Sequence, residues 1–303
     1  MRIKINNCLL RYIEKLISAS TNYKWVVKSV YAVIGGDINQ AYCIRSADQK
    51  YFVKLNALKY LEMFKAEAKG LALLASTQSF KVPRVVVCDS FEKQCFLVLE
   101  YLDLSGPTNI TNFAQSLAKL HQQNSQQQKQ SEFGLDQDNF IGLTAQKNNF
   151  SANWAQFFAE QRLGFQCELL KAKGIKHSVL DPVESVIQTI DAFFIDYQAS
   201  ACLLHGDLWQ GNYGFDPSGK AIIYDPACYY GDHEVDLAML ELFGHPGQSF
   251  FSAYDAVYPI DPGYQRRKHL YNLYHILNHA NLFAGGYVNQ AQRMAIDLLH
   301  MIR

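Results

Sequence analysis

The sequence has no excess of one charge, because Lys and Arg together number 28 and Asp and Glu also number 28. A chain without net charge has no general electrostatic attraction for nucleic acid or for an anionic membrane surface. The chain also lacks any apolar run approaching 18 uncharged residues, the length that a membrane-spanning helix requires. We therefore expect neither a nucleic-acid partner nor a membrane partner.

Paired cysteine motifs are missing as well. The seven cysteines are odd in number, scattered along the chain and without a Cys-x-x-Cys pair, which favours buried reduced thiols over a disulfide framework or a zinc site. Charges interrupt the apolar positions of the first 15 residues, so they lack the continuous apolar core of a signal peptide. A cytoplasmic location is the resulting expectation.

The Walker A motif, Gly-x-x-x-x-Gly-Lys-Ser/Thr, is also absent, which argues against a P-loop nucleotide site. What the sequence does have is material for a large core, since 49% of its 303 residues are hydrophobic and 13% are aromatic. This composition argues against disorder and fits one large domain or two lobes around a cleft.

The first third of the chain predicts a small sheet lobe. Apolar spacing and β-prone runs indicate, in chain order, a helix at 8–20, strands at 25–34, 41–45 and 51–55, a helix at 58–76, and strands at 85–87 and 96–99. Three strands, a helix and two strands make an antiparallel sheet with one helix packed on it. The pattern breaks at 103–107, so we place the N-lobe at 1–103 and the C-lobe at 104–303.

The remainder of the chain predicts a larger, mainly helical C-lobe. Helices are expected at 113–121, 154–172 and 183–198, the last starting after Asp181-Pro182, and helical spacing resumes from Asp236 onward. The Gln-rich stretch 122–130 is expected to be a solvated helix end or a loop. The fold class is therefore α+β with two lobes.

The strongest chemical pattern is His205-Gly206-Asp207-Leu208-Trp209-Gln210-Gly211-Asn212. An apolar run delivers Asp207 into a loop, and Asn212 follows five residues later. The protein-kinase catalytic loop has the same interval, with an Asp that receives the substrate hydroxyl proton and an Asn that holds Mg²⁺. A second apolar run, 221–224, ends at Asp225, which fits the Mg²⁺-binding Asp of a kinase or, alternatively, an Asp capping a turn before a proline.

Two further patterns fit phosphate binding. Lys54 lies in a predicted strand, and Glu67 lies on the following predicted helix, as in the ion pair that positions the ATP phosphates in kinases. Glu62 is the other helix candidate, and apolar residues at helical spacing around Glu67 favour Glu67. The segment Gly35-Gly36-Asp37-Ile38-Asn39, between two strands, predicts either a phosphate-binding loop or a hairpin turn.

Together these residues resemble the fructosamine kinase (ketosamine-3-kinase) family, relatives of aminoglycoside phosphotransferases and choline kinases. The similar segments are 35–42, 52–54, 97–102, 117–121, 133–139, 157–162, 205–212 and 225–239. The resemblance spans nearly the whole chain, and the last two segments are the most specific. It implies a protein-kinase-like fold with a small antiparallel-sheet N-lobe and a larger helical C-lobe.

The resemblance also implies roles for individual residues. Asp207 would be the catalytic base, Asn212 and Asp225 would bind Mg²⁺, and Lys54 would hold the phosphates of ATP, braced by Glu67. Glu100, Tyr101 and Leu102 would be the hinge whose backbone meets adenine. The implied reaction phosphorylates the sugar 3-hydroxyl of a ketosamine, either a small molecule or a glycated protein lysine, and leads to deglycation.

Several residues near these motifs have open roles. Trp209 could form a wall of the sugar pocket or could pack to fix the loop. His205 is expected to orient the catalytic loop, and a direct substrate contact is the alternative. Glu234 and Asp236 could anchor that loop, face the substrate amine or be solvated charges.

Two other functions remain in view. One is an aminoglycoside- or choline-type small-molecule phosphotransferase. The other is a nucleotide-binding pseudokinase scaffold, which would have lost one of Lys54, Asp207, Asn212 or Asp225, and all four are present. A monomer or weak homodimer is expected.

Overall fold

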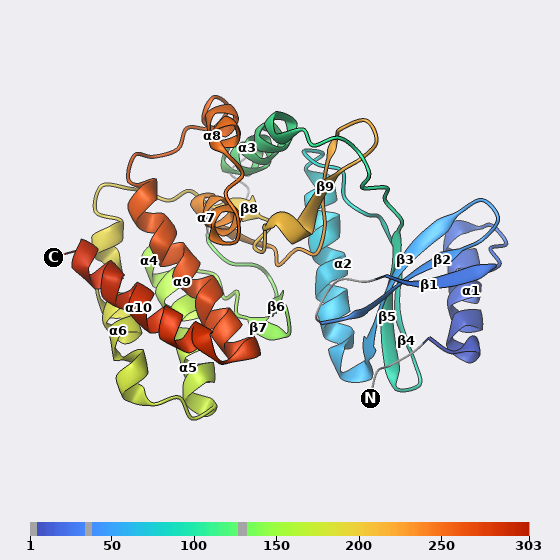
Figure 1. Cartoon of the computed structure of the whole chain (residues 1–303), viewed down its shortest axis with the longest axis horizontal. Helices are drawn as coiled ribbons and strands as arrows, with labels where there is room; N and C mark the ends of the chain where they lie inside the picture. Colours follow the sequence, from blue (N-terminus) through green and yellow to red (C-terminus); the bar gives the residue numbers. More distant parts are fainter. Residues whose placement is uncertain (1–4, 34–37, 127–131, 303) are drawn as a thin grey trace. The chain divides into compact units, whose positions relative to one another are not determined.

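The computed structural model describes residues 5–33, 38–126 and 132–302. The described chain divides into two compact units (Figure 1). The first comprises Met1–Pro107 together with Phe215–Tyr224, and the second comprises Thr108–Gly214 and Asp225–Arg303. The first unit thus also contains a short segment, Phe215–Tyr224, that is distant from its other residues in sequence. The sequence did not predict this.

The first unit is built on a five-stranded antiparallel sheet of order β1-β2-β3-β5-β4. The strands are β1 (Ser29–Val33), β2 (Gln40–Arg45), β3 (Lys50–Ala57), β4 (Val85–Phe91) and β5 (Gln94–Glu100). The strand predicted from residue 25 begins only at Ser29. The predicted order of strands and helices, and their antiparallel pairing, are confirmed.

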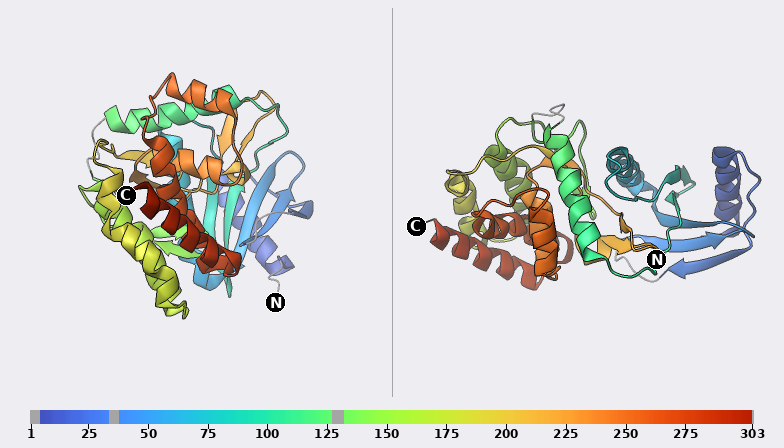
Figure 2. Two further views of the ribbon diagram at one scale, coloured as in Figure 1. Left: turned by 60° about the vertical axis from the view of Figure 1, so that its left-hand side comes forward. Right: turned by 90° about the horizontal axis from the view of Figure 1, so that it is seen from above.

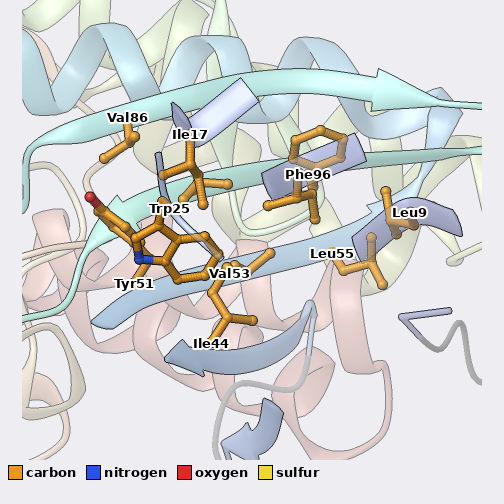
Figure 3. Packing of buried hydrophobic residues seen from close by; sticks show 11 residues of the cluster. Leu9, Ile17, Trp25, Ile44, Tyr51, Val53, Leu55, Val86 and Phe96 are labelled. Carbon is orange, nitrogen blue, oxygen red and sulfur yellow. The ribbon is translucent and has the colours of Figure 1, made fainter. Parts of the chain in front are cut away.

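Helices cover both faces of this sheet (Figure 1). Side chains alternate between the faces of a strand, so Val53 and Leu55 of β3 pack with Leu9 and Ile17 of α1 (Asn7–Thr21) in one apolar cluster (Figure 3). The even-numbered residues of β3 point the other way, toward α2 (Leu61–Ser76). The sequence predicted only one of these two helices to pack on the sheet.

The second unit is mainly helical. Its principal helices are α3 (Ile110–Gln126), α5 (Phe165–Ala172), α6 (His177–Gln188), α7 (Glu234–Leu242), α8 (Gln248–Asp255), α9 (Tyr264–Phe283) and α10 (Gly286–Met301). α3 packs against α8, and α10 packs against α9 and α6, which the two views of Figure 2 show from different sides. Short strands pair as β8 (Cys202–Leu204) with β11 (Tyr229–Gly231), β9 (Tyr213–Phe215) with β10 (Ala221–Ile223), and β6 (Asn139–Ile141) with β7 (Thr144–Gln146).

The predicted helix at 183–198 is wrong in position. α6 begins at His177 and ends at Gln188, so Pro182 lies inside the helix instead of at its start. A proline within a helix leaves the carbonyl four residues earlier without its N–H donor. Here that carbonyl, of Ser178, accepts a hydrogen bond of 3.4 Å from Gln292 Nε2 of α10. A tertiary contact therefore replaces the missing hydrogen bond.

Other helix predictions hold with changes. The predicted helix at 154–172 is helical throughout, but a π-helical segment, Phe158–Gly164, separates α4 (Trp154–Phe157) from α5. α3 extends the predicted helix at 113–121 in both directions and includes the first part of the Gln-rich stretch, whose remainder lies outside the described residues. Within the described ranges, no helix has the length and apolar character needed to cross a bilayer.

Candidate active site

The loop that carries Asp207 follows directly from β8, a buried strand of three residues. β8 pairs with β11, with Leu204 opposite Tyr229, and the N–H of Ala227 donates to His205 O at 2.8 Å. Gly206 has φ +81°, and a Cβ at this position would lie 2.2 Å from Ala227 O. Only glycine fits here, because the backbone is left-handed and the neighbouring chain is in contact with it.

Asp236, in the first turn of α7, anchors the same loop through its side chain. Its carboxylate is fully buried and accepts hydrogen bonds from the backbone N–H groups of His205 at 2.8 Å and Gly206 at 2.9 Å. The anchoring role that the sequence offered for Asp236 therefore matches its position, and the solvated alternative does not.

His121 continues this anchor on the other side of Asp236. Its Nε2 lies 3.3 Å from Asp236 Oδ2, and its Nδ1 lies 2.7 Å from the hydroxyl of Tyr254. Burial lowers the pKa of His121, so the neutral ring donates from Nε2 and accepts the Tyr254 hydroxyl at Nδ1. The sequence gave no signal for this role, because a histidine at the end of an amphipathic helix has many uses.

Asn212 brings the two acidic loops together. Its Nδ2 donates to Asp207 O at 2.8 Å and Asp207 Oδ2 at 3.3 Å, and lies 3.5 Å from Asp225 O. With the NH₂ group used in this way, the amide oxygen of Asn212 is the atom left for a cation. An amide oxygen and the carboxylate of Asp225 are the hard oxygen ligands that Mg²⁺ prefers, so these residues fit a magnesium site.

Asp225 is itself held in an unusual backbone conformation. Its φ is +58°, in the left-handed region that residues other than glycine seldom occupy, although Asp enters it more readily than most. Such a conformation persists only where the surrounding structure fixes it. It marks the place where the chain turns from β10 into the Pro226-Ala227-Cys228 segment.

The acid–base properties of Asp207 suit a general base. Burial of the carboxyl group and the nearby negative charge of Asp225 raise the pKa of Asp207 to about 7, while the hydrogen bond from Asn212 opposes this shift. A base whose pKa lies near the operating pH combines the correct protonation state with useful basicity. A bound cation would lower this pKa, because it would offset the charge of Asp225.

In the first unit, Lys54 of β3 contacts α2. Its Nζ lies 2.6 Å from Glu67 Oε1, and the two side chains are 6% and 10% exposed. Glu62 instead pairs with Lys65 in an ion pair at 2.8 Å that is largely exposed to solvent. The partner favoured by the sequence is thus the one that approaches Lys54, and its role in phosphate binding stays a prediction.

The end of the glycine-rich segment is tied to the same strand. Asn56, two residues after Lys54 on the same face of β3, donates from Nδ2 to Asn39 Oδ1 at 2.7 Å and to Ile38 O at 3.3 Å. Gly35, Gly36 and Asp37 lie outside the described residues. Asn56 was not identified from the sequence, although its spacing of two from Lys54 in a strand was an available signal.

The predicted hinge residues close β5 and continue beyond it. Glu100 is the last residue of β5, and its N–H donates to Arg84 O at 2.8 Å. Tyr101 and Leu102 follow in irregular backbone outside the sheet. The ring of Tyr101 is 39% exposed and lies 5.1 Å from Lys50 Nζ. Their contact with adenine stays a prediction.

Three residues were named as weaker substrate candidates. His205 is fully buried, and its Nδ1 accepts a hydrogen bond from the N–H of Asp207 at 3.3 Å. Its side chain therefore contacts the backbone of its own loop. Trp209 is 39% exposed, and its ring lies edge-on to Phe243, with ring centroids 6.3 Å apart, and close to Gly211, so the residue is partly packed and partly open to solvent.

Glu234, the third candidate, has an internal position. It is fully buried, and Arg267 binds both of its oxygens, from Nε at 2.7 Å and Nη2 at 2.8 Å. Arg267 also stacks on the ring of Tyr197, 3.6 Å from its centroid. The solvated alternative is wrong for Glu234, and this ion pair gives no support to a contact with substrate.

Comparison with known proteins gives one family over almost the whole chain. The family model described as fructosamine kinase matches residues 9–301. The probable ketoamine kinase of Vibrio parahaemolyticus is 42% identical over 283 residues, which are 92% of this chain and 96% of that protein. The chloroplastic protein-ribulosamine 3-kinase of Oryza sativa subsp. japonica is 35% identical over 279 residues, or 91% of this chain and 80% of that protein.

Solved structures agree in fold. The crystal structure of a Haemophilus somnus protein assigned as a fructosamine-3-kinase has a TM-score of 0.86 at 32% identity, covering 95% of this chain and 97% of that one. A choline kinase from Streptococcus pneumoniae has a TM-score of 0.61 at 18% identity, covering 96% and 99%, a likeness of fold alone. The predicted protein-kinase-like α+β fold is confirmed.

Proposed function

Because the chain belongs to the fructosamine kinase family, we propose that it phosphorylates the sugar 3-hydroxyl of ketosamines, with ATP as donor. The enzyme is a kinase, and as such uses a nucleotide phosphoryl donor. The observation that carries the proposal is the arrangement of Asp207, Asn212 and Asp225 in two loops braced against each other. The named activities of the ketoamine and ribulosamine kinases that it resembles supply the substrate class.

Asp207 orients the acceptor hydroxyl and takes its proton. The hydroxyl oxygen forms a bond to the γ-phosphorus of ATP, the bond from that phosphorus to the β–γ bridging oxygen breaks, and ADP leaves with that oxygen. The pKa of about 7 leaves a substantial fraction of Asp207 ionised at neutral pH. A positioned base of this kind contributes about 10²–10⁴-fold to the rate.

The remaining residues bind and orient the donor. Asn212, through its amide oxygen, and Asp225 would hold Mg²⁺, which when bound neutralises phosphate charge. Lys54, fixed by Glu67, binds phosphate oxygens, and the backbone of Glu100, Tyr101 and Leu102 receives adenine. These assignments rest on the loop geometry, on the Lys54–Glu67 ion pair and on family membership.

The exposed part of Trp209 would contact the sugar of the ketosamine. Aromatic faces suit the C–H face of a sugar, and Trp209 is two residues from the base. The carrier amine is that of a free amino acid or of a glycated protein lysine. Its release after 3-phosphorylation would make the enzyme a deglycating one.

All seven cysteines are free, which fits the expected reducing cytoplasm.

The test is Mg²⁺-dependent ADP release from ATP with ribulose-lysine, fructose-lysine, choline and kanamycin, comparing the wild type with Asp207→Ala. Turnover on a ketosamine that falls about 10²-fold or more in the variant supports the proposal. Turnover restricted to choline or kanamycin would replace the substrate and retain the kinase chemistry. ATP binding without turnover on any acceptor would favour a nucleotide-binding scaffold.

A further inference from the structure

A buried hydrogen-bond network holds the chain just after Asp225. The hairpin of β6 and β7 supplies two amide side chains, Asn139 and Gln146, which are 5% and 1% exposed. Asn139 Nδ2 donates to Cys228 O at 2.6 Å, and Gln146 Nε2 donates to Ala227 O at 3.0 Å. Two consecutive carbonyls are thus fixed, two and three residues after Asp225.

The two amides are joined to each other and to a tyrosine. Gln146 Nε2 also donates to Asn139 Oδ1 at 2.8 Å, and the hydroxyl of Tyr274, on α9, donates to Gln146 Oε1 at 2.7 Å. Each amide therefore has its oxygen and its nitrogen engaged, which fixes its orientation. Because the oxygen and nitrogen of both amides are engaged, this pair specifies one local geometry.

Arg162 anchors the network from the opposite side. Its side chain is fully buried, and Nη2 donates to Asn148 Oδ1 at 2.8 Å, while Asn148 Nδ2 donates to Asn139 Oδ1 at 2.9 Å. Nη1 donates to Lys147 O. The charge stacks on the ring of Tyr229, 3.9 Å from its centroid, and within the described ranges no carboxylate pairs with it.

Burying a guanidinium without a carboxylate partner costs free energy of folding, so the presence of Arg162 in the interior calls for a physical reason. Arg162 lies in the π-helical segment Phe158–Gly164, and π-helical turns inside helices often accompany functional sites. A chain of donors runs from Arg162 through Asn148 and Asn139 to a carbonyl of the segment that follows Asp225. The cation thereby polarises hydrogen bonds that end beside the candidate metal ligand.

We propose that Gln146 and Asn139, anchored by Arg162, are positioning residues that hold Asp225 in its left-handed conformation and so set the affinity for the divalent cation. The left-handed conformation of Asp225 needs support from its surroundings. On one side the support is Asn212 at Asp225 O, and on the other it is the two carbonyls held by the amides. The inference rests on the metal role of Asp225 in the proposed function.

The test uses Mn²⁺ in the presence of ADP as the probe, with binding measured by electron paramagnetic resonance of free Mn²⁺. Gln146→Met keeps the size of the side chain and removes the donor to Ala227. The change also removes the hydrogen bonds of Gln146 to Asn139 and from Tyr274, but the bond to Ala227 O is the one that holds the segment after Asp225. We expect the Kd for Mn²⁺ to rise about fivefold to tenfold, since the loss of a single hydrogen bond corresponds to a factor of about five. Asn139→Ser is the second variant, with a rise in the same direction, if Gln146→Met does not fold.

Leu298→Ala is the matched control, because Leu298 is fully buried in α10 and makes none of the hydrogen bonds of the network, so its truncation destabilises the protein and leaves these bonds in place. Its Kd for Mn²⁺ should stay within about twofold of wild type while its melting temperature falls. The proposal is overturned if Gln146→Met binds Mn²⁺ like wild type, or if Leu298→Ala weakens Mn²⁺ as much as Gln146→Met does.

Asp225→Asn separates this inference from the proposed function. Mn²⁺ binding that is unchanged in Asp225→Asn would overturn both the metal role and the positioning role. Ketosamine turnover is not part of the measurement. A wild type that phosphorylates no ketosamine, yet shows the expected Mn²⁺ series, would therefore refute the substrate assignment and support the positioning role.

Discussion

Replacing Asp236 with asparagine tests how the catalytic loop is held. In the wild type the fully buried carboxylate accepts from the N–H groups of His205 and Gly206 and contacts His121 Nε2. An amide has one oxygen and one NH₂ group, so at least one backbone N–H of the loop would face a donor. Asn and Asp side chains have nearly the same shape, so the expected loss of stability is electrostatic in origin.

The magnitude follows from the hydrogen bonds. A hydrogen bond to a charged group contributes about 1.5–3 kcal/mol, and an unsatisfied buried donor costs about 1–3 kcal/mol. We expect Asp236→Asn to lower the free energy of unfolding by about 3–5 kcal/mol, or roughly 10 °C in melting temperature for a domain of this size. A shift of the loop by about 1 Å would lower kcat by about 10²-fold.

The pH dependence adds a second signature. Burial by itself would raise the pKa of Asp236, yet the hydrogen bond from His121 and the N–H of Gly206 lower it below its ordinary value. Because the folded pKa is lowered, this contribution to stability is complete above about pH 4, the ordinary Asp value. It is lost as the pH falls through the lower folded pKa, so the difference between Asp236→Asn and wild type should shrink there.

Asp232→Asn is the matched control. Asp232 is also fully buried, but it accepts from the hydroxyls of Tyr197 at 2.9 Å and Tyr271 at 2.5 Å, outside the catalytic loop. We expect a loss of melting temperature and a kcat within about threefold of wild type in this variant. Urea unfolding between pH 3 and 8 and steady-state kinetics measure both quantities. An Asp236→Asn protein with wild-type kcat would refute the anchoring argument.

Three further predictions concern single groups. Glu67→Gln should lower kcat/KM for ATP about tenfold or more, because the buried ion pair between Lys54 and Glu67 is lost. Glu62→Gln, at an exposed ion pair, should stay within about twofold, and equal effects would contradict this. Gly206→Ala should cost about 2–4 kcal/mol in urea unfolding, since its Cβ would meet a backbone oxygen at 2.2 Å and its φ is +81°, and wild-type stability would count against this. The pKa of Asp207 is raised to about 7, so the ionised base is present above pH 7 and lost below it, and kcat/KM should fall on acidification. The inflection of this pH profile should move to lower pH as the Mg²⁺ concentration is increased. An inflection independent of Mg²⁺ would argue against Asp207 as the base.

The sequence was sufficient for the order of elements in the first unit. Alternating apolar residues in β3 and helical spacing in α1 and α2 reflect local rules, and the antiparallel pairing of β2 with β3 and of β4 with β5 follows from short connections. The pairing of β3 with β5, which are separated in sequence by α2 and β4, is a tertiary contact. The prediction of a helix at 183–198 was wrong because a contact distant in sequence bears on where that helix begins. Pro182 is a strong local stop signal, and the carbonyl of Ser178 that it leaves without a helical donor accepts a hydrogen bond from the distant Gln292.

For the candidate site, the spacing of Asp207, Asn212 and Asp225 selected three residues that the structure brings together through Asn212, and their chemical roles stay predictions. It could do so because one loop and one strand end carry them, and short-range geometry is encoded in spacing. The same reasoning favoured Glu67 over Glu62 as the partner of Lys54. Packing of α2 on the sheet decided between them by bringing Glu67 to 2.6 Å from Lys54.

What the sequence determined by itself is therefore the chemistry, the family and the succession of strands and helices. The tertiary structure alone decided which buried groups hold that chemistry in place. Asp236, Asn139 and Gln146 act on backbone N–H and C=O groups, which every residue possesses, so no side-chain pattern reveals their targets. Their partners lie about 30 to 90 residues away in sequence, and only folding brings them within hydrogen-bond distance.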